Sequence, residues 1–289
     1  MTPEIIADYQ NETGEGCLWH PEEQRLYWLD IPAGLLFCYD PATGHSARFE
    51  LGAPTGAFTI AADGDLVLFM AAGAVRTWRA GHFTGTIIES LPEELDNRFN
   101  DVIADPEGRV FCGVMSTPRR AGRLYRLDPD GQLTIVLPDT GTSNGMGFSP
   151  DEQWLYHCDS RRGTITRFRY DRATGALSEP GLFLDAPVPG GGGPDGMTVD
   201  AEGCIWSARW NDGCLVRYDP SAREIGRIAF PARKVSCVTF GGPDYTDCYV
   251  TTAGGGARAE EGSGAGALFH LRPGVRGKPE FRSRLRALV

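Results

Sequence analysis

Apolar and polar residues alternate in short stretches along the whole chain, and turns rich in glycine, proline and aspartate separate these stretches. A period of two is typical of β-strands with one buried face, because successive side chains point to opposite sides of a sheet. No segment of useful length shows the apolar period of 3.6 that an amphipathic helix needs, and residues 91–95 are too few to form one. The pattern therefore predicts an all-β protein.

One phrase recurs about six times, at intervals of roughly 41 to 51 residues, which is the range of propeller blades. A small or polar residue opens a strand, apolar residues follow two and four positions later, and an acidic turn leads into a second strand. Two further strands follow in each copy, separated by turns such as Tyr-Asp-Pro-Ala-Thr-Gly at 39–44. We therefore predict a six-bladed β-propeller with four antiparallel strands per blade, formed as a single domain by residues 1–289.

The residue that opens the phrase occupies the same register in each copy. In chain order these residues are Glu15, Gly56, Asn100, Asn144, Asp195 and Cys237. The first strand of every propeller blade lines the central channel, so we expect these side chains to converge on the axis. Two carboxylates and two amides suit a divalent cation, whereas a buried pair of acids without a partner is costly. The register predicts a metal site at one end of the channel.

Arginines are frequent in the loops that the strand directions place on the same face as this site. They are Arg98, Arg119, Arg120, Arg161, Arg162 and Arg258. In a chain of formal net charge -10, such arginines indicate a polar or anionic ligand. A loop arginine is also commonly just solvated, so both interpretations stand for Arg98, Arg119 and Arg120.

Composition and charge exclude several other classes. A sequence pI of about 5.0 disfavours nucleic acid and anionic membranes as partners. Without a signal-like or membrane-spanning segment we expect a cytoplasmic protein, present as a monomer or a weak homo-oligomer. The eight cysteines show no Cys-x-x-Cys spacing and are expected to be reduced core residues. No histidine opens a copy of the phrase, and no Gly-x-Ser-x-Gly motif is present.

Four motifs, taken in order, resemble those of the SMP-30/gluconolactonase/LRE family. They are Gly-Glu-Gly at 14–16, Asn-Arg-Phe-Asn-Asp at 97–101, Ser-Asn-Gly at 143–145 and Pro-Asp-Gly-Met at 194–197. The resemblance extends from about residue 11 to about residue 272. That family consists of six-bladed propellers that use one divalent ion to hydrolyse sugar lactones. The resemblance implies hydrolysis of an aldonolactone, such as glucono-, xylono- or arabinonolactone, to the aldonic acid, and leaves Ca, Zn, Mn, Mg and Fe(II) open as the ion.

The resemblance also implies roles for individual residues. Glu15, Asn144 and Asp195 would hold the metal, and Asp195 would serve as the general base. Asn100 would contact the ion through water or contact the substrate, and Arg98 would bind substrate oxygens.

The sequence departs from some relatives in the loop after Gly-Val-Met at 113–115. Those relatives carry an acidic residue there, where this chain has Ser-Thr-Pro-Arg-Arg at 116–120. Sugar preference therefore cannot be carried across, and Arg119 and Arg120 become candidate substrate-binding residues in an overhanging loop. A phosphotriesterase-like hydrolase and a non-catalytic calcium- or sugar-binding propeller remain alternatives.

Overall fold

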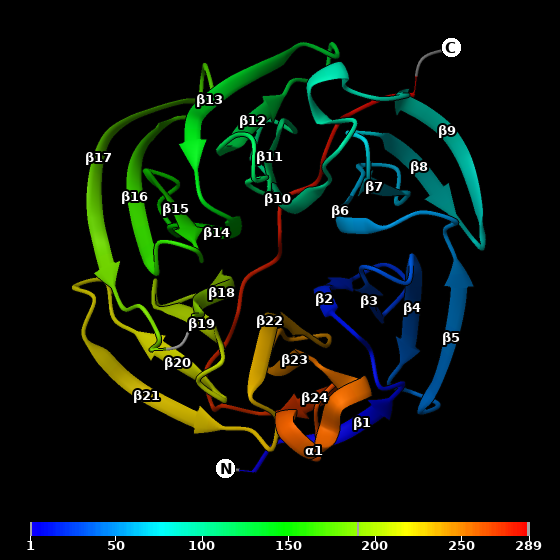
Figure 1. Ribbon diagram of the computed structural model, residues 1–289, viewed down its shortest axis with the longest axis vertical. Helices are drawn as coiled ribbons and strands as arrows, with labels where there is room; N and C mark the ends of the chain where they lie inside the picture. Colours follow the sequence, from blue (N-terminus) through cyan, green and yellow to red (C-terminus); the bar gives the residue numbers. More distant parts are fainter. Residues whose placement is uncertain (1, 190, 288–289) are drawn as a thin grey trace.

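The computed structural model describes residues 2–189 and 191–287. In these residues, 24 strands form six four-stranded antiparallel sheets arranged as a ring around a central channel (Figure 1). The predicted six-bladed β-propeller is confirmed. Among the described residues, no helix is long and apolar enough to cross a membrane.

Five of the sheets are built from consecutive strands, each beginning at the channel and ending at the rim. Blade 1 contains β2 (Gly14–His20), β3 (Arg25–Asp30), β4 (Leu35–Asp40) and β5 (His45–Glu50). Blade 2 contains β6 (Thr55–Ile60), β7 (Leu66–Met70), β8 (Val75–Arg79) and β9 (His82–Ile88). Blade 3 contains β10 (Phe99–Ala104), β11 (Val110–Val114), β12 (Gly122–Leu127) and β13 (Leu133–Thr140). Blade 4 contains β14 (Ser143–Phe148), β15 (Trp154–Asp159), β16 (Thr164–Asp171) and β17 (Ala176–Asp185). Blade 5 contains β18 (Gly193–Val199), β19 (Ile205–Trp210), β20 (Cys214–Tyr218) and β21 (Glu224–Ala229).

The sixth blade joins the two ends of the propeller. It contains β22 (Lys234–Gly241), β23 (Asp247–Ala253) and β24 (Ala267–Leu271), and β1 (Glu4–Asp8) completes it as the outermost strand. Glu4 pairs with His270 and Asp8 with Ala267 in this antiparallel contact. The first strand of the chain thereby closes the ring. In the described part of the chain, the remaining elements are three short helices: η1 (Pro92–Glu94), η2 (Gly255–Ala257) and α1 (Arg258–Glu261).

The hydrophobic core lies between neighbouring blades. Every residue of the inner strands β6, β14 and β18 is buried, whereas the rim strand β21 is mostly exposed. Aromatic rings pack across blade boundaries, as in the T-shaped pair Phe69–Phe99 with centroids 5.3 Å apart. All eight cysteines are buried and free, as predicted. This packing makes the inner strands a rigid base for side chains at their first residues.

Two glycines allow the inner strands to approach one another at the channel. A Cβ atom on Gly145 would lie 2.4 Å from the Asp195 carbonyl oxygen, and one on Gly196 would lie 2.7 Å from the Ser236 carbonyl oxygen. Only glycine fits at such distances. Close to these glycines the strand pairing shifts, between Asn144 and Met146 and between Pro194 and Met197. Bulges of this kind re-aim neighbouring side chains, here those of Asn144 and Asp195.

The segment after β24 crosses the middle of the ring and ends beside β9 (Figure 1). It binds the turns between the first and second strands of several blades. The backbone bonds are Ala201 N to Arg276 O (2.9 Å), Gly277 N to Tyr245 O (2.8 Å), Ala62 N to Ser283 O (2.8 Å) and Arg284 N to Gly108 O (2.9 Å). Because these turns lie at the ends of the inner strands, this C-terminal segment covers the face opposite the predicted site.

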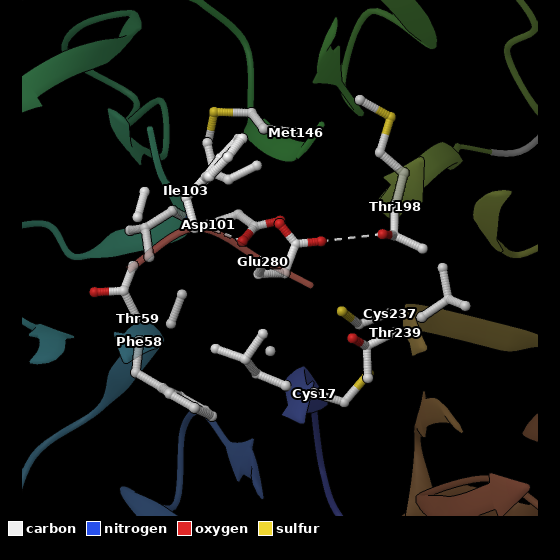
Figure 2. A pocket seen from close by; sticks show the side chains of 18 residues that line it. Cys17, Phe58, Thr59, Asp101, Ile103, Met146, Thr198, Cys237, Thr239 and Glu280 are labelled. Carbon is white, nitrogen blue, oxygen red and sulfur yellow. Dashed lines mark hydrogen bonds between the residues drawn. The ribbon is translucent and has the colours of Figure 1, made fainter. Parts of the chain in front are cut away.

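A small cavity of about 70 Å³ lies in the channel next to this segment. Figure 2 shows Asp101 and Glu280 side by side within it, with Cys17 and Cys237 on another wall. The Thr198 hydroxyl donates to Glu280 at 3.2 Å. Burial raises the pKa of Asp101 to about 6, and the Glu280 charge adds to the rise.

Candidate metal and substrate site

A second cavity, of about 270 Å³, opens at the other end of the channel. Residues at the beginnings of inner strands from four blades provide its polar side chains, and loops form its rim. Glu15 comes from β2, Asn100 from β10, Asn144 from β14 and Asp195 from β18, and all four are buried. Arg98 lies directly before β10 and lines the same cavity. The structure therefore brings these five predicted residues together.

Glu15 and Asp195 form a buried acidic pair. Their exposed fractions are 8% and 3%, and no Lys, Arg or His nitrogen in the described residues lies within 4.0 Å of either carboxylate. Burial raises the pKa of both groups, Glu15 further raises that of Asp195, and the Asp101 charge adds to the rise for Glu15. A cation between the two carboxylates would remove the cost of burying both charges.

Asn144 and Ser160 position Asp195. The Asn144 amide donates to Asp195 Oδ1 and, at 3.1 Å, to the Ser160 hydroxyl. Ser160 in turn donates to the carbonyl oxygen of Pro194 at 2.7 Å. Asn144 of the neighbouring blade thus holds the Asp195 carboxylate, and Ser160 holds the backbone directly before Asp195. Both bonds limit the rotamers of Asp195.

Arg98 and Asn100 form a second linked pair. Arg98 Nη1 donates to Asn100 Oδ1 at 2.7 Å and to the Phe99 carbonyl oxygen at 2.9 Å. Asn100 Nδ2 donates to the Ser143 carbonyl oxygen at 2.9 Å. Burial lowers the pKa of Arg98, while the charges of Glu15 and Asp195 oppose the shift. No bond from Arg98 Nε or Nη2 occurs within residues 2–189 and 191–287, so both nitrogens can bind a ligand.

The donor set fits a divalent cation. Two carboxylates and the amide oxygen of Asn144 are hard ligands of the kind that such ions take in proteins. In the part of the chain that is described, no three His, Cys, Asp or Glu side chains cluster as a metal site. The amide of Asn144 is therefore needed to complete the set. Asn100 Oδ1 accepts from the charged guanidinium of Arg98, and this positive charge opposes direct binding of a cation and favours a contact with substrate or water.

Arg119 and Arg120 lie outside this cavity. Arg119 is exposed, and Arg120 pairs with buried Glu94 at 2.6 Å and with Asp96 at 3.2 Å. Both arginines line a neighbouring surface depression instead. Their proposed contact with substrate stays a prediction.

The structure also corrects one member of the register and adds residues that the sequence pattern missed. Cys237 lines the deeper cavity beside Cys17, because it follows the pairing shift of its strand as Met146 and Met197 follow theirs. Ser160 and Arg161 reach the site from the end of β15, where no repeated motif marks them. Asp101 is a third carboxylate of the channel and lines the deeper cavity. Its position directly after Asn100 in the repeated phrase is the signal in the sequence that indicates it.

Fold and site together define a six-bladed propeller whose axial cavity presents two carboxylates, two amides and two arginines. Residues 13–254 match the model of the SMP-30/gluconolactonase/LRE-like region, and the chain belongs to this family. The resemblance seen in the sequence motifs is therefore confirmed.

Individual relatives match over nearly the whole chain. The chain is 46% identical to the pentonolactonase XacC of Haloferax volcanii, covering 99% of both proteins. It is 32% identical to the 6-deoxy-6-sulfogluconolactonase of Pseudomonas putida, over 96% of this chain and 97% of the relative. The crystal structure of the calcium-binding protein regucalcin from Agrobacterium tumefaciens superimposes with a TM-score of 0.87 at 27% identity, covering 99% of this chain and 97% of that one.

Proposed function

We propose that the protein hydrolyses a sugar lactone to the aldonic acid with one divalent cation held by Glu15, Asn144 and Asp195. The buried acidic pair at one end of the channel, which forms no ion pair within residues 2–189 and 191–287, carries this proposal. The names of the two lactonase relatives support the substrate class, and the pentonolactonase favours a five-carbon aldonolactone such as xylono- or arabinonolactone.

The bound cation would polarise the lactone carbonyl as a Lewis acid. Asp195, held by Asn144 and Ser160, is placed to accept the proton of the attacking water as general base. Arg98 donates its free Nε and Nη2 to substrate oxygens, while Asn100 keeps the guanidinium in place through its bond to Nη1. The chain thereby supplies proton transfer and orientation next to the reacting ester.

Metal removal tests the proposal directly. Dialysis against a chelator should abolish hydrolysis of xylono- and gluconolactone, and reloading with a panel of Ca, Zn, Mn, Mg and Fe(II) should restore it. Asp195→Ala should lose both metal binding and turnover, because one side chain serves both purposes. Asp195→Asn should retain weakened metal binding without turnover. Full activity of metal-free protein, or a wild-type kcat for Asp195→Ala, would refute the mechanism.

A calcium-binding propeller without catalysis is the second candidate, favoured by the similarity to a regucalcin described as a calcium-binding protein. Calcium titration followed by calorimetry, together with the lactone assay, separates the two: binding without turnover on any aldonolactone supports the second candidate. Cytoplasmic location and a monomeric or weakly associated state stay predictions.

A further inference from the structure

An open depression lies beside the candidate site. Its volume is about 570 Å³, and it is lined by residues 117–121, residues 139–141, Arg161 and Arg162. Arg161 also lines the 270 Å³ cavity that contains Glu15 and Asp195. This side chain therefore stands at the boundary between the two hollows, where a ligand in the cavity could extend into the depression.

One side-chain hydrogen bond orients the exposed Arg161 at this boundary. Its Nη1 donates to the Ser116 hydroxyl of the neighbouring blade at 2.7 Å. A Cβ atom on Gly141 would lie 2.8 Å from Arg161 Cβ, so the glycine leaves room for the arginine to cross between the blades. The bond to Ser116 orients the guanidinium, and the absence of a side chain at Gly141 leaves space for the Arg161 Cβ.

The four arginines of the depression differ in their charge balance. Arg120 pairs with Glu94 and Asp96, and Arg162 pairs with Asp139 at 2.9 Å and Asp159 at 3.5 Å. Within residues 2–189 and 191–287, neither Arg119 nor Arg161 has a carboxylate within 4.0 Å. In a chain of formal net charge -10, two uncompensated positive charges at one hollow favour an anionic ligand.

We propose that the depression is a subsite for an anionic substituent of the substrate, with Arg161 as the residue that binds it and Arg119 in support. The substituent would be a phosphate, sulfonate or carboxylate on the part of the sugar remote from the lactone carbonyl. A guanidinium binds the paired oxygens of such groups through two parallel charge-assisted hydrogen bonds. This inference rests on the proposed lactonase function and gives it a substrate class, the negatively charged sugar lactones.

A pair of substrates that differ only in charge tests the subsite. The metal-loaded enzyme is assayed on gluconolactone and on the same lactone carrying a 6-phosphate. Arg161→Gln should reduce the ratio of kcat/KM for the phosphorylated over the neutral lactone by on the order of tenfold or more, mainly through KM. Arg162→Gln is the matched control, since it removes the adjacent arginine whose charge is already neutralised, and should leave that ratio close to the wild-type value. An unchanged ratio in Arg161→Gln would overturn the proposal.

Salt separates contact from long-range attraction. A direct contact keeps most of the difference between wild type and Arg161→Gln at 0.5 M salt, whereas attraction alone fades as the screening length falls below ~5 Å. If the difference vanishes at high salt, Arg161 only attracts anions and the subsite is refuted.

A binding measurement keeps the subsite testable if no lactone is hydrolysed. Calorimetry compares the ring-opened acids with and without the 6-phosphate, gluconate and 6-phosphogluconate, on wild type and Arg161→Gln. Tighter binding of the phosphorylated acid that disappears in Arg161→Gln supports the subsite independently of turnover. Equal affinities of the wild type for the two acids would overturn it, whereas absence of turnover alone would overturn only the lactonase proposal.

Discussion

At the scale of single residues, a buried histidine supports the strand that carries Asn144. His157 on β15 is 4% exposed, and its Nε2 lies 2.7 Å from the hydroxyl of Ser143, the residue before Asn144. The carbonyl oxygen of Ser143 also accepts from Asn100. Burial lowers the pKa of His157 to about 4. The neutral imidazole of His157 thus supports both amides of the site through Ser143, which precedes Asn144 and binds Asn100.

This histidine should make the fold sensitive to acid. Between the ordinary histidine pKa of 6.5 and about 4, the unfolded chain binds a proton that the folded chain does not. The stabilisation from neutral His157 is therefore complete above pH 6.5 and is lost as the pH falls towards 4. The cost between pH 6.5 and 5 should be roughly 2 kcal/mol at most. Urea unfolding at pH 7 and pH 5 should show a smaller loss for His157→Gln than for wild type.

The control for this experiment is His45→Gln, which alters an exposed histidine on a rim strand. It should keep the wild-type loss of stability between the two pH values. If His157→Gln loses as much stability on acidification as wild type, the buried ring is not the group responsible.

At the scale of elements, the C-terminal segment connects the turns on the face opposite the site. Phe281 packs against Phe148 of blade 4 with ring centroids 5.7 Å apart. Leu285 is 5% exposed and belongs to the hydrophobic cluster between blades 2 and 3. The segment adds contacts between blades that are far apart in sequence, so it should stabilise the ring as a whole.

Leu285→Ala should therefore reduce stability without changing the chemistry. Removal of a buried leucine side chain costs about 2–5 kcal/mol, which corresponds to a fall in Tm of several degrees for a chain of this length. The kcat/KM of the metal-loaded enzyme at 25 °C should not change, because the segment lies on the other face. Arg286→Ala, at a neighbouring exposed position, should leave Tm close to wild type. A wild-type Tm for Leu285→Ala would show that the segment contributes little to stability.

At the scale of the whole molecule, the proposed cation ligands come from blades 1, 4 and 5, so a bound ion would link distant parts of the ring. An ion that binds only the folded state adds about 2.7 kcal/mol at a hundredfold excess over its Kd. Thermal denaturation with and without the cation should show a rise in Tm of several degrees.

Glu15→Gln should shrink this rise, because one ligand charge is lost. Glu12→Gln, which neutralises an exposed carboxylate three residues earlier, is the matched control and should show the full wild-type rise. Equal shifts for all three proteins would place the ion elsewhere.

Local patterns in the sequence were sufficient to predict the blades and most of the site. The alternation of side chains specifies strands because its period matches the pleat, and the repeat length specifies four-stranded blades. Once the first strand of each blade lines the channel, equal register brings Glu15, Asn100, Asn144 and Asp195 together, and the structure places all four in one cavity. Repetition thus converts sequence spacing into spatial proximity.

Other features depend on contacts between segments that share no repeat, and only the tertiary structure decided them. The pairing of β1 with β24 and the path of the C-terminal segment across the channel join residues far apart in the chain, without any periodic signal. The same holds for charge balance: Arg120 and Arg161 look alike in the sequence, yet Glu94 and Asp96 neutralise only Arg120. Which arginine remains available to a ligand depends on how loops of different blades meet, because a side-chain charge is compensated through space and not along the chain.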